Sequence, residues 1–335
     1  MRKVLVTGSA GFIGFHLTKA LLGLGIEVVG IDNLNNYYDP QLKINRLEHL
    51  NKFVTDGGIG KCYHFVKLDI SDNVALSRLF QEHNFDVVIN LAAQAGVRYS
   101  LENPKAYVDS NLVGFANILE CCRHAKIGHL LFASSSSVYG MNSKQPFSTG
   151  DNTDYPISLY AATKKSNELL AHSYSHLFDI PCTGLRFFTV YGPYGRPDMA
   201  YYSFTEAISE GRPIDVFNSG IMKRDFTYID DIVEGVVRLI DHIPASQANE
   251  TTNAEAPFRV LNIGNNNPVT LRRFIAAIES SVGKKAIENL LPMQAGDVPI
   301  TYADIDPLSE LCGFHPNTSI EDGIEKFVDW FNAYY

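Results

Sequence analysis

Short apolar runs, separated by segments long enough to form helices, constrain the fold of this chain more than any other sequence feature. The seven runs are Val4–Val6, Val28–Ile31, Phe65–Leu68, Val87–Leu91, His129–Ala133, Cys182–Leu185 and Val260–Ile263. Strands that are buried on both faces of a parallel sheet have this nearly continuous apolar character. The sequence therefore predicts a parallel sheet in the interior of the protein.

The segments between these runs predict helices that connect one strand to the next. They are Leu17–Leu24, Val74–Phe80, Asn111–Cys122, Tyr160–Phe178 and Ile232–Ile240. Right-handed crossovers between parallel strands place such helices on both faces of the sheet. We therefore expect an α/β fold with a doubly wound parallel sheet of the Rossmann type.

The pattern changes after Arg186, where glycine, proline and aromatic residues become frequent. We expect a smaller C-terminal substrate-binding lobe there. The predicted boundaries are 1–186 for the Rossmann domain, with 230–264 returning to it, and 187–229 and 265–335 for the lobe. Residues 244–257, rich in Ala, Asn, Thr and Glu, are typical of a surface loop.

Composition excludes several functional classes. The net charge is −9 with no basic block, which argues against nucleic acid or an anionic membrane as the partner. No apolar run approaches the roughly 18 to 20 residues that a membrane-spanning helix needs, and the N-terminal run is too short for a signal peptide. The 5 cysteines have no metal-ligand spacing and indicate reduced thiols. We expect a cytoplasmic protein without a metal site.

A glycine-rich segment follows the first predicted strand and predicts a dinucleotide site. Gly8, Gly11 and Gly14 precede the first helix, and Asp32 ends the second strand 18 residues after Gly14. Glycines let backbone N–H groups approach a pyrophosphate, while a carboxylate at the strand end accepts the ribose hydroxyls. That carboxylate would repel a 2′-phosphate, so NAD is favoured over NADP. The alternative is a turn that only packs the helix on the strand.

Tyr160 and Lys164 are four residues apart at the start of a predicted helix, so their side chains share one face. A phenol can act as a base at neutral pH only if its pKa falls well below about 10. A neighbouring ammonium favours the phenolate, so Tyr160 is a candidate general base and Lys164 the group that tunes it. Alone, such a pair is more often an ordinary half-exposed pair.

Four serines follow the fifth apolar run and lead directly into Val138-Tyr139-Gly140. A flexible linker rarely interrupts a core strand in this way. The serines are therefore better interpreted as part of a site at the end of that strand.

Together these motifs resemble the extended short-chain dehydrogenase/reductase family, whose Thr-Gly-x-x-Gly-Phe-Ile-Gly pattern matches residues 7–14. The resemblance implies a catalytic triad of Ser135, Tyr160 and Lys164, with Tyr160 and Lys164 also contacting the cofactor. The other cofactor-binding residues that it implies are Gly8, Gly11, Phe12, Ile13, Gly14, Asp32, Asn33, Asp69, Ile70, Leu91, Ala92, Ala93, Gln94 and Asn111.

Within that family the chain resembles the UDP-glucuronate 4-epimerases over nearly its whole length. The segments that carry this likeness are 98–104, 185–199, 222–229 and 295–299. Relatives that dehydrate or decarboxylate nucleotide sugars typically have acidic residues where this chain has Ser136 and Ser137. UDP-galactose 4-epimerases usually have Asn where it has Thr189. The resemblance therefore implies reversible 4-epimerisation of UDP-glucuronate through a 4-keto intermediate.

The resemblance also implies how the substrate is held. Ser136, Ser137 and Thr189 would bind the sugar carboxylate with Arg196 as a charged partner, and Arg224 would bind the diphosphate. The full substrate set that we expect is Ser136, Ser137, Thr189, Arg196, Val216, Phe217, Arg224, Gln294 and Asp297. For Arg224, a surface salt bridge with Asp225 or Asp231 is the alternative.

The likeness to this family further suggests a homodimer that pairs through the helices at 111–122 and 160–178. Three other functions stay open at this point. They are 4-epimerisation of another UDP-sugar, decarboxylation of UDP-glucuronate as in a UDP-xylose synthase, and a non-catalytic NAD-binding scaffold.

Overall fold

The computed structural model describes residues 2–248, 255–292 and 300–335. Its internal contacts divide it into two compact units. As far as they are described, unit 1 contains Met1–Gly140, Asn152–Arg186 and Gly235–Leu261, and unit 2 contains Met141–Asp151, Phe187–Glu234 and Asn262–Tyr335. Residues 141–151 thus cluster with unit 2, whereas the sequence-based boundaries assign them to the Rossmann domain.

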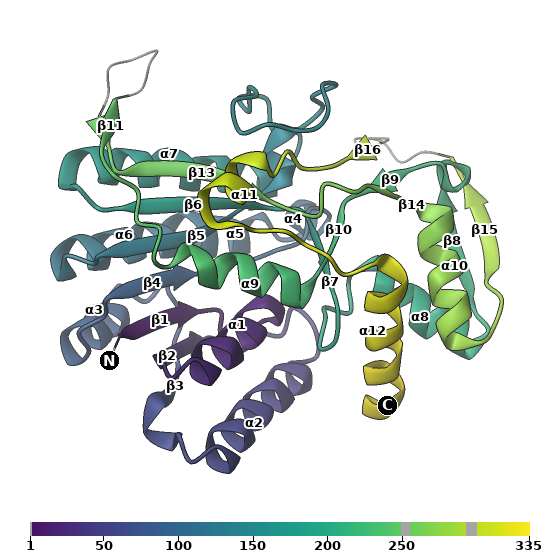
Figure 1. Ribbon diagram of the computed structural model, residues 1–335, viewed down its shortest axis with the longest axis horizontal. Coiled ribbons are helices and arrows are strands. Elements are labelled where there is room, and N and C mark those ends of the chain that lie inside the picture. The colour runs from purple at the N-terminus through teal and green to yellow at the C-terminus, as the bar shows by residue number, and fades with distance from the viewer. Residues whose placement is uncertain (1, 249–254, 293–299) are drawn as a thin grey trace. The chain divides into compact units, whose positions relative to one another are not determined.

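A seven-stranded sheet forms the centre of unit 1 (Figure 1). Its strands are β1 (Lys3–Thr7), β2 (Glu27–Asp32), β3 (Tyr63–Lys67), β4 (Val87–Asn90), β5 (His129–Ser135), β6 (Cys182–Phe187) and β13 (Phe258–Ile263). Their order is β13-β6-β5-β4-β1-β2-β3, and the pairs from β3 through β5 are parallel. All seven predicted strands are present, which confirms the doubly wound α/β fold.

Helices cover both faces of this sheet. They are α1 (Phe12–Gly23), α2 (Pro40–Asp56), α3 (Asn73–Glu82), α4 (Tyr99–Glu102), α5 (Pro104–Tyr107), the π-helical turn η2 (Val108–Val113), α6 (Gly114–Ala125) and α7 (Leu159–Phe178). Apolar residues of α3, α6 and α7 share one buried cluster with the strands, among them Leu79, Ile118 and Ala171. Helices α1 and α2 pack on each other, and Figure 1 draws them on the opposite face.

Helix α2 is the long element of unit 1 that the apolar pattern did not predict. Its buried face includes Lys43 and Arg46 beside Leu42, Leu50 and Val54. Two cations in the buried stripe conceal the period that an apolar helix face normally has. The start of the helix does carry a sequence signal, because the side chain of Asp39 accepts the Gln41 N–H and a proline follows it.

Unit 2 contains short strands and four further helices that the sequence did not predict individually. Its main elements are β7 (Thr189–Tyr191), α8 (Ala200–Glu210), β8 (Pro213–Phe217), β9 (Lys223–Arg224), β10 (Phe226–Tyr228), β14 (Val269–Thr270), α10 (Leu271–Val282), β15 (Ile287–Leu291), β16 (Ile300–Thr301), α11 (Asp306–Cys312) and α12 (Ile320–Tyr334). Helix α9 (Ile229–Leu239) begins in unit 2 and ends in unit 1.

Three local expectations differ from the structure. The first helix begins at Phe12, directly after the glycine turn, rather than at Leu17. The helix expected at 111–122 is α6, and it is preceded by the π-helical turn η2. Residues 244–257 contain β11 (Gln247–Ala248) and β12 (Glu255–Ala256), which pair antiparallel. Short two-residue strands have no apolar periodicity to detect.

None of the helices in the described ranges is long and apolar enough to cross a membrane. All five cysteines are free thiols.

Candidate active site

The glycine turn at residues 8–14 forms a close-packed bend between β1 and α1. Gly8 has φ 70°, and a Cβ there would lie 2.9 Å from the backbone nitrogen of Ala92. A Cβ on Gly14 would overlap the Gly8 carbonyl, whose oxygen also accepts the Gly11 N–H at 2.9 Å. No side chain caps the start of α1 in this described segment. The first N–H groups of the helix are therefore suited to an anionic ligand.

Asp32 ends β2, is 7% exposed and accepts the Leu34 N–H at 2.8 Å. The Nζ atom of Lys43 lies 3.5 Å from its carboxylate and also donates to Asn35. Asp32 is thus placed as predicted, but a buried cation accompanies it. Because Lys43 offsets its charge, repulsion of a 2′-phosphate by Asp32 is weaker than the sequence argument assumed.

Asn33 and Asp69 meet at the ends of neighbouring strands. The Asn33 amide donates to the Asp69 carboxylate at 2.8 Å, and Ser71 donates to its other oxygen. Burial raises the pKa of Asp69, but these hydrogen bonds outweigh it and lower the pKa overall. Ile70 is buried, and its carbonyl accepts the Asn117 amide. The three residues predicted here therefore lie just after the ends of β2 and β3, close in sequence to Asp32 or to the end of the adjacent strand.

Asn111 connects the segment after β4 to helix α7. Its side chain accepts the Gln94 N–H at 2.8 Å and donates to the Gln94 carbonyl and the Thr163 hydroxyl, each at 3.0 Å. Its own carbonyl accepts the Asn167 amide. Asn111 lies in η2, and π-helical turns are frequent at functional sites. The half-buried residues Leu91, Ala92 and Ala93 lead into Gln94.

Ser135 ends β5 and lies at the turn that carries the next two serines. Its hydroxyl accepts the Ser137 N–H at 3.2 Å and is 7% exposed. Ser136 and Ser137 begin the 3-10 turn η3 (Ser136–Tyr139) and are half-buried. The serine run is thus a strand end and a turn, as the sequence predicted.

Tyr160 and Lys164 both lie in the first two turns of α7, which begins after its cap Ser158. Tyr160 is half-buried, and its ring packs edge-on against Tyr107 with centroids 6.1 Å apart. The Lys164 ammonium is buried and donates to the Ala133 carbonyl at 2.8 Å. Burial lowers the pKa of Lys164 to about 8. The helix thus brings Lys164 to the end of β5, with Tyr160 one turn earlier on the same helix.

A buried ion pair lies one helical turn after Lys164. The Glu168 carboxylate accepts the Ser134 hydroxyl at 2.6 Å and two guanidinium N–H groups of Arg186, both at 2.8 Å. The guanidinium lies 4.8 Å from the centroid of the Tyr139 ring. Burial opposes the Arg186 charge, but Glu168 outweighs this effect and raises the pKa of Arg186. Helix α7, the end of β5 and β6 are therefore joined by a charged contact.

Sequence reasoning did not find Glu168, Arg186, Lys43 or Tyr107. Glu168 continues the spacing of four that starts at Tyr160 and Lys164, so the helical pattern contained a signal for it. Arg186 is distant from Glu168 along the chain and carried no such signal. Tyr107 is completely buried and donates from its hydroxyl to the Ala95 carbonyl at 2.8 Å, which only the folded chain shows.

In unit 2, Thr189 begins β7 and Arg224 ends β9. The Thr189 N–H donates to the Asp225 carbonyl at 3.2 Å, and Thr189 pairs with Phe226 in parallel register. Arg224 donates to the Lys223 carbonyl and is half-buried. These two predicted substrate residues therefore come from two different small sheets, and Asp225 follows Arg224 directly and accepts the Thr189 N–H.

The Asp225 carboxylate holds this part of unit 2 together. It is completely buried and accepts the backbone N–H groups of Asn265, Asn266 and Ala303 at 2.6, 3.0 and 2.9 Å. Burial raises the pKa of Asp225, while the N–H groups act in the opposite direction. The second predicted partner of Arg224, Asp231, accepts the Thr318 N–H.

The remaining predicted substrate residues differ in their surroundings. Arg196 lies in the loop before α8 and forms an ion pair with Asp198, with Nε 3.0 Å from Oδ1. Val216 near the end of β8 is completely buried, whereas Phe217 is half-buried. Gln294 and Asp297 lie outside the described residues.

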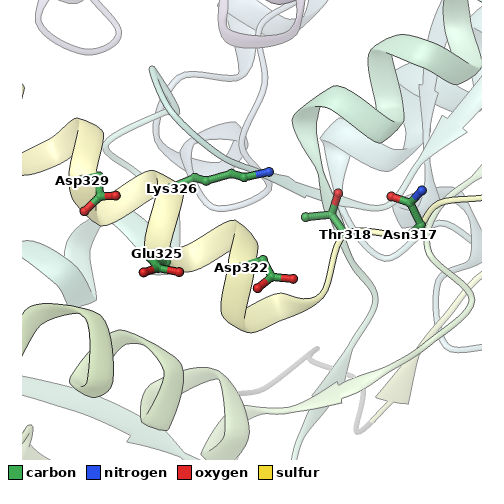
Figure 2. A pocket seen from close by; sticks show the side chains of 6 residues that line it. All are labelled: Asn317, Thr318, Asp322, Glu325, Lys326 and Asp329. Atoms are coloured by element: carbon green, nitrogen blue, oxygen red, sulfur yellow. The ribbon is translucent and has the colours of Figure 1, made fainter.

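A separate hollow of about 390 Å³ opens along helix α12 in unit 2 (Figure 2). It is lined by Asn317, Thr318, Asp322, Glu325, Lys326 and Asp329. None of the predicted site residues lines it, and three carboxylates there would repel an anionic sugar nucleotide. Within the described ranges, no cluster of three or more His, Cys, Asp or Glu side chains could hold a metal ion.

Comparison with known proteins identifies the family. Residues 4–255 match the model of the NAD dependent epimerase/dehydratase family. The chain belongs to this family.

Similar proteins cover nearly the whole chain. Protein CapI of Staphylococcus aureus is 54% identical over 340 residues, which cover 99% of both chains. A probable UDP-glucuronate 4-epimerase of Rhizobium meliloti (strain 1021) is 51% identical over 341 residues, covering 99% of this chain and 98% of that one. The crystal structure of a UDP-glucuronic acid 4-epimerase from Bacillus cereus, in complex with UDP-glucuronic acid and NAD, is 36% identical, with TM-score 0.86 and coverage of 99% and 100%.

NAD, the cofactor of the family, fits the residues found in unit 1. The cradle at Gly8 and Gly14 has no room for a Cβ, and the uncapped start of α1 follows it. The Asp32 carboxylate lies at the end of the adjacent strand, where ribose hydroxyls are accepted in this type of sheet. These are the features that a dinucleotide needs.

The Glu168–Arg186 pair leads to a testable prediction. Arg186→Met leaves the buried Glu168 carboxylate without its cation, so we expect the free energy of unfolding to fall by about 3–5 kcal/mol. The double variant Glu168→Gln/Arg186→Met removes both charges and should be more stable than Arg186→Met alone. Urea unfolding measures both effects.

The exposed pair of Arg273 and Glu321 offers a matched control. Arg273→Met should change stability by no more than about 1 kcal/mol. The coupling between Glu168 and Arg186 would be contradicted if Glu168→Gln/Arg186→Met lost as much stability as the sum of the losses in Glu168→Gln and Arg186→Met.

Proposed function

We propose that this protein is an isomerase, an NAD-dependent UDP-glucuronate 4-epimerase that converts UDP-glucuronate and UDP-galacturonate into each other. The observation that carries the proposal is the junction of β5 and α7. There Ser135, Tyr160 and Lys164 are held on one anchored strand end and one helix, and serines rather than acids follow Ser135. The similarity to the Bacillus cereus enzyme supports the choice of a glucuronate substrate.

Tyr160 takes the proton from the sugar 4-hydroxyl and later returns it. Its helix position places it in the turn before Lys164, whose buried ammonium favours the phenolate. Ser135 donates a hydrogen bond to the reacting oxygen. NAD, which Gly8, Gly14 and Asp32 would hold, would supply reversible hydride transfer at carbon 4. The chain residues therefore supply proton transfer and orientation.

The substrate carboxylate requires a separate set of contacts. Oxidation at carbon 4 creates a β-keto acid, which loses carbon dioxide readily. We assign carboxylate binding to Ser136, Ser137 and Thr189, with Arg196 as the charged partner. Arg224 binds the diphosphate. The remaining substrate contacts in the proposal are Val216, Phe217, Gln294 and Asp297.

Unit 1 is the proposed NAD-binding domain and unit 2 the proposed nucleotide-sugar-binding lobe. The glycine cradle and Asp32 support the first assignment, and Thr189 and Arg224 support the second. The contacts proposed for Phe12, Ile13, Asn33, Asp69, Ile70, Leu91–Gln94 and Asn111 belong to NAD binding. The free state of all five thiols supports the proposed cytoplasmic location.

A homodimer through the outer faces of α6 and α7 is part of the proposal. Val113, just before α6, is 46% exposed, and Leu169 on α7 is 57% exposed, while the two helices pack on each other. Exposed apolar side chains on adjacent helices are typical of a contact surface.

Light scattering tests the dimer. We expect twice the chain mass for the natural protein and a shift toward single chains for Leu169→Glu, because a charge there would be desolvated on pairing. Leu24→Glu, on a residue 62% exposed at the end of α1, is the matched control. A natural protein that elutes as single chains would refute this contact.

The first test of the activity replaces the proposed base. Tyr160→Phe keeps the ring that packs on Tyr107 and removes the hydroxyl. We expect turnover of UDP-glucuronate to fall by roughly 10²- to 10⁴-fold, the usual contribution of a general acid or base. A panel of UDP-sugars, separated by chromatography, measures the substrate preference at the same time.

Tyr155→Phe is the control, since Tyr155 is 82% exposed. NAD content, measured after denaturation, should be unchanged in both variants. Near-normal turnover of Tyr160→Phe would remove Tyr160 from the mechanism, and bound NAD without turnover of any sugar in the natural protein would favour a scaffold.

Substitution of Thr189 tests whether its hydroxyl favours epimerisation over decarboxylation. A hydrogen bond to a charged group contributes about 1.5–3 kcal/mol, which changes a ratio of rates by roughly ten- to a hundredfold. Thr189→Val keeps the shape and removes the hydroxyl, so we expect slower epimerisation together with NADH and a decarboxylated 4-keto pentose. Thr189→Ser should retain the natural product. Unchanged products from Thr189→Val, measured by mass spectrometry, would contradict the carboxylate role.

A further inference from the structure

The loop between β7 and α8, residues 192–199, has a backbone conformation that its neighbours determine. Gly192 has φ 145°, and a Cβ there would lie 2.6 Å from the Ile229 side chain. Tyr194 has φ 56°, in the left-handed region. A Cβ on Gly195 would overlap the Tyr201 hydroxyl. This loop therefore has little freedom to move without disturbing unit 2.

Arg196 is held at two points of this loop. Its backbone N–H donates to the Tyr201 hydroxyl at 3.0 Å, and its guanidinium is paired with Asp198. The Arg196 and Asp198 side chains are 22% and 30% exposed, so the guanidinium is oriented yet open to solvent. A guanidinium that is already oriented and partly exposed can donate hydrogen bonds to the carboxylate of a ligand with little reorganisation.

The C-terminal helix α12 packs its aromatic side chains against Tyr201, one of these two points, and against Tyr194 of the same loop. Tyr201 is completely buried, and its ring meets Phe327 edge-on with centroids 4.9 Å apart. The Tyr194 and Trp330 rings are in contact, with centroids 5.0 Å apart and planes tilted by 43°. The start of α12 also reaches β7, because the Tyr191 hydroxyl donates to the Ser319 carbonyl at 3.1 Å. The strand of Thr189 and the loop of Arg196 thus rest on the same helix.

Trp330 acts here through its ring. Its indole N–H is buried and has no hydrogen-bond partner among the described residues. A buried unpaired N–H costs roughly 1–3 kcal/mol, so hydrogen bonding does not explain a tryptophan at this position. The ring contacts that it makes with Tyr194 and Tyr334 explain it.

We infer that Trp330 and Tyr194 are positioning residues that hold the 192–196 loop so that Arg196 recognises the carboxylate of the substrate. Helix α12 would then contribute to the preference for a uronate over a neutral hexose. This inference rests on the proposed function, which assigns the carboxylate to Arg196. It extends that function to a helix outside the regions that the sequence motifs identified.

The chain contains one tryptophan, so Trp330 reports on this loop directly. In the NAD-loaded natural protein, UDP-glucuronate should change the tryptophan emission on binding. UDP-glucose, which lacks the carboxylate, should bind with a smaller change. The titrations give a Kd for each sugar nucleotide.

Tyr194→Asn is the variant that tests the contact. Asparagine tolerates a positive φ, so the substitution removes the ring with little added backbone strain. We expect the Kd and KM for UDP-glucuronate to rise about tenfold, a change of about 1.4 kcal/mol, with kcat and the Kd for UDP-glucose nearly unchanged. Arg196→Gln should show the same loss of selectivity, and the double variant should lose little more.

Tyr335→Asn is the matched control. Tyr335 belongs to the same aromatic cluster through Phe331 and Tyr202 and is 73% exposed. This variant should keep the natural selectivity. If Tyr194→Asn does not fold, Trp330→Leu tests the same contact by activity alone, with the ratio of KM values for the two sugars as the readout.

The outcomes separate the two levels of the proposal. If the natural protein does not epimerise UDP-glucuronate, the proposed function fails and the inference fails with it. If it does, equal weakening of both sugar nucleotides in Tyr194→Asn would show a purely structural role and overturn the inference alone. A fully additive double variant would also overturn it.

Discussion

The docking of helix α7 on the end of β5 is the contact on which the candidate active site depends. Two polar side chains on successive turns of the helix make it, Lys164 to the Ala133 carbonyl and Glu168 to the Ser134 hydroxyl. Ser135 is the next residue of the strand, and Tyr160 lies one turn before Lys164, so these contacts position both residues that we propose as catalytic. A shift of the helix by one residue would separate all of them.

The two charges in this junction are stabilised in different ways. Glu168 has a full partner in Arg186, so its negative charge is compensated within the protein. Lys164 donates to the neutral Ala133 carbonyl, and burial lowers the pKa of Lys164 to about 8. Lys164 is thus mostly protonated at neutral pH and loses its proton as the pH rises through that value. The Glu168 charge thus anchors the helix through its ion pair, and the Lys164 charge is the one that we propose acts on Tyr160.

Unit 2 achieves rigidity by a different route. The Asp225 carboxylate is saturated by backbone N–H groups of two loops, and the aromatic side chains of α12 pack on α8 and on the loop after β7. Thr189 and Arg196 are therefore positioned by neighbours that never need to touch a substrate. Such indirect support is what gives a binding group its orientation before the ligand arrives.

The sequence by itself determined the sheet, the glycine turn and the Tyr160–Lys164 pair. These depend on local patterns, namely apolar runs, glycines where a Cβ has no room, and a helical spacing of four residues. Only the tertiary structure decided that Arg186 pairs with Glu168, that Lys43 accompanies Asp32, and that α12 supports the Arg196 loop. Each of these contacts joins residues from different elements. In α2, the cations lie on the buried face of the helix. Local periodicity carries no information on such contacts, because they form only when separate elements pack together.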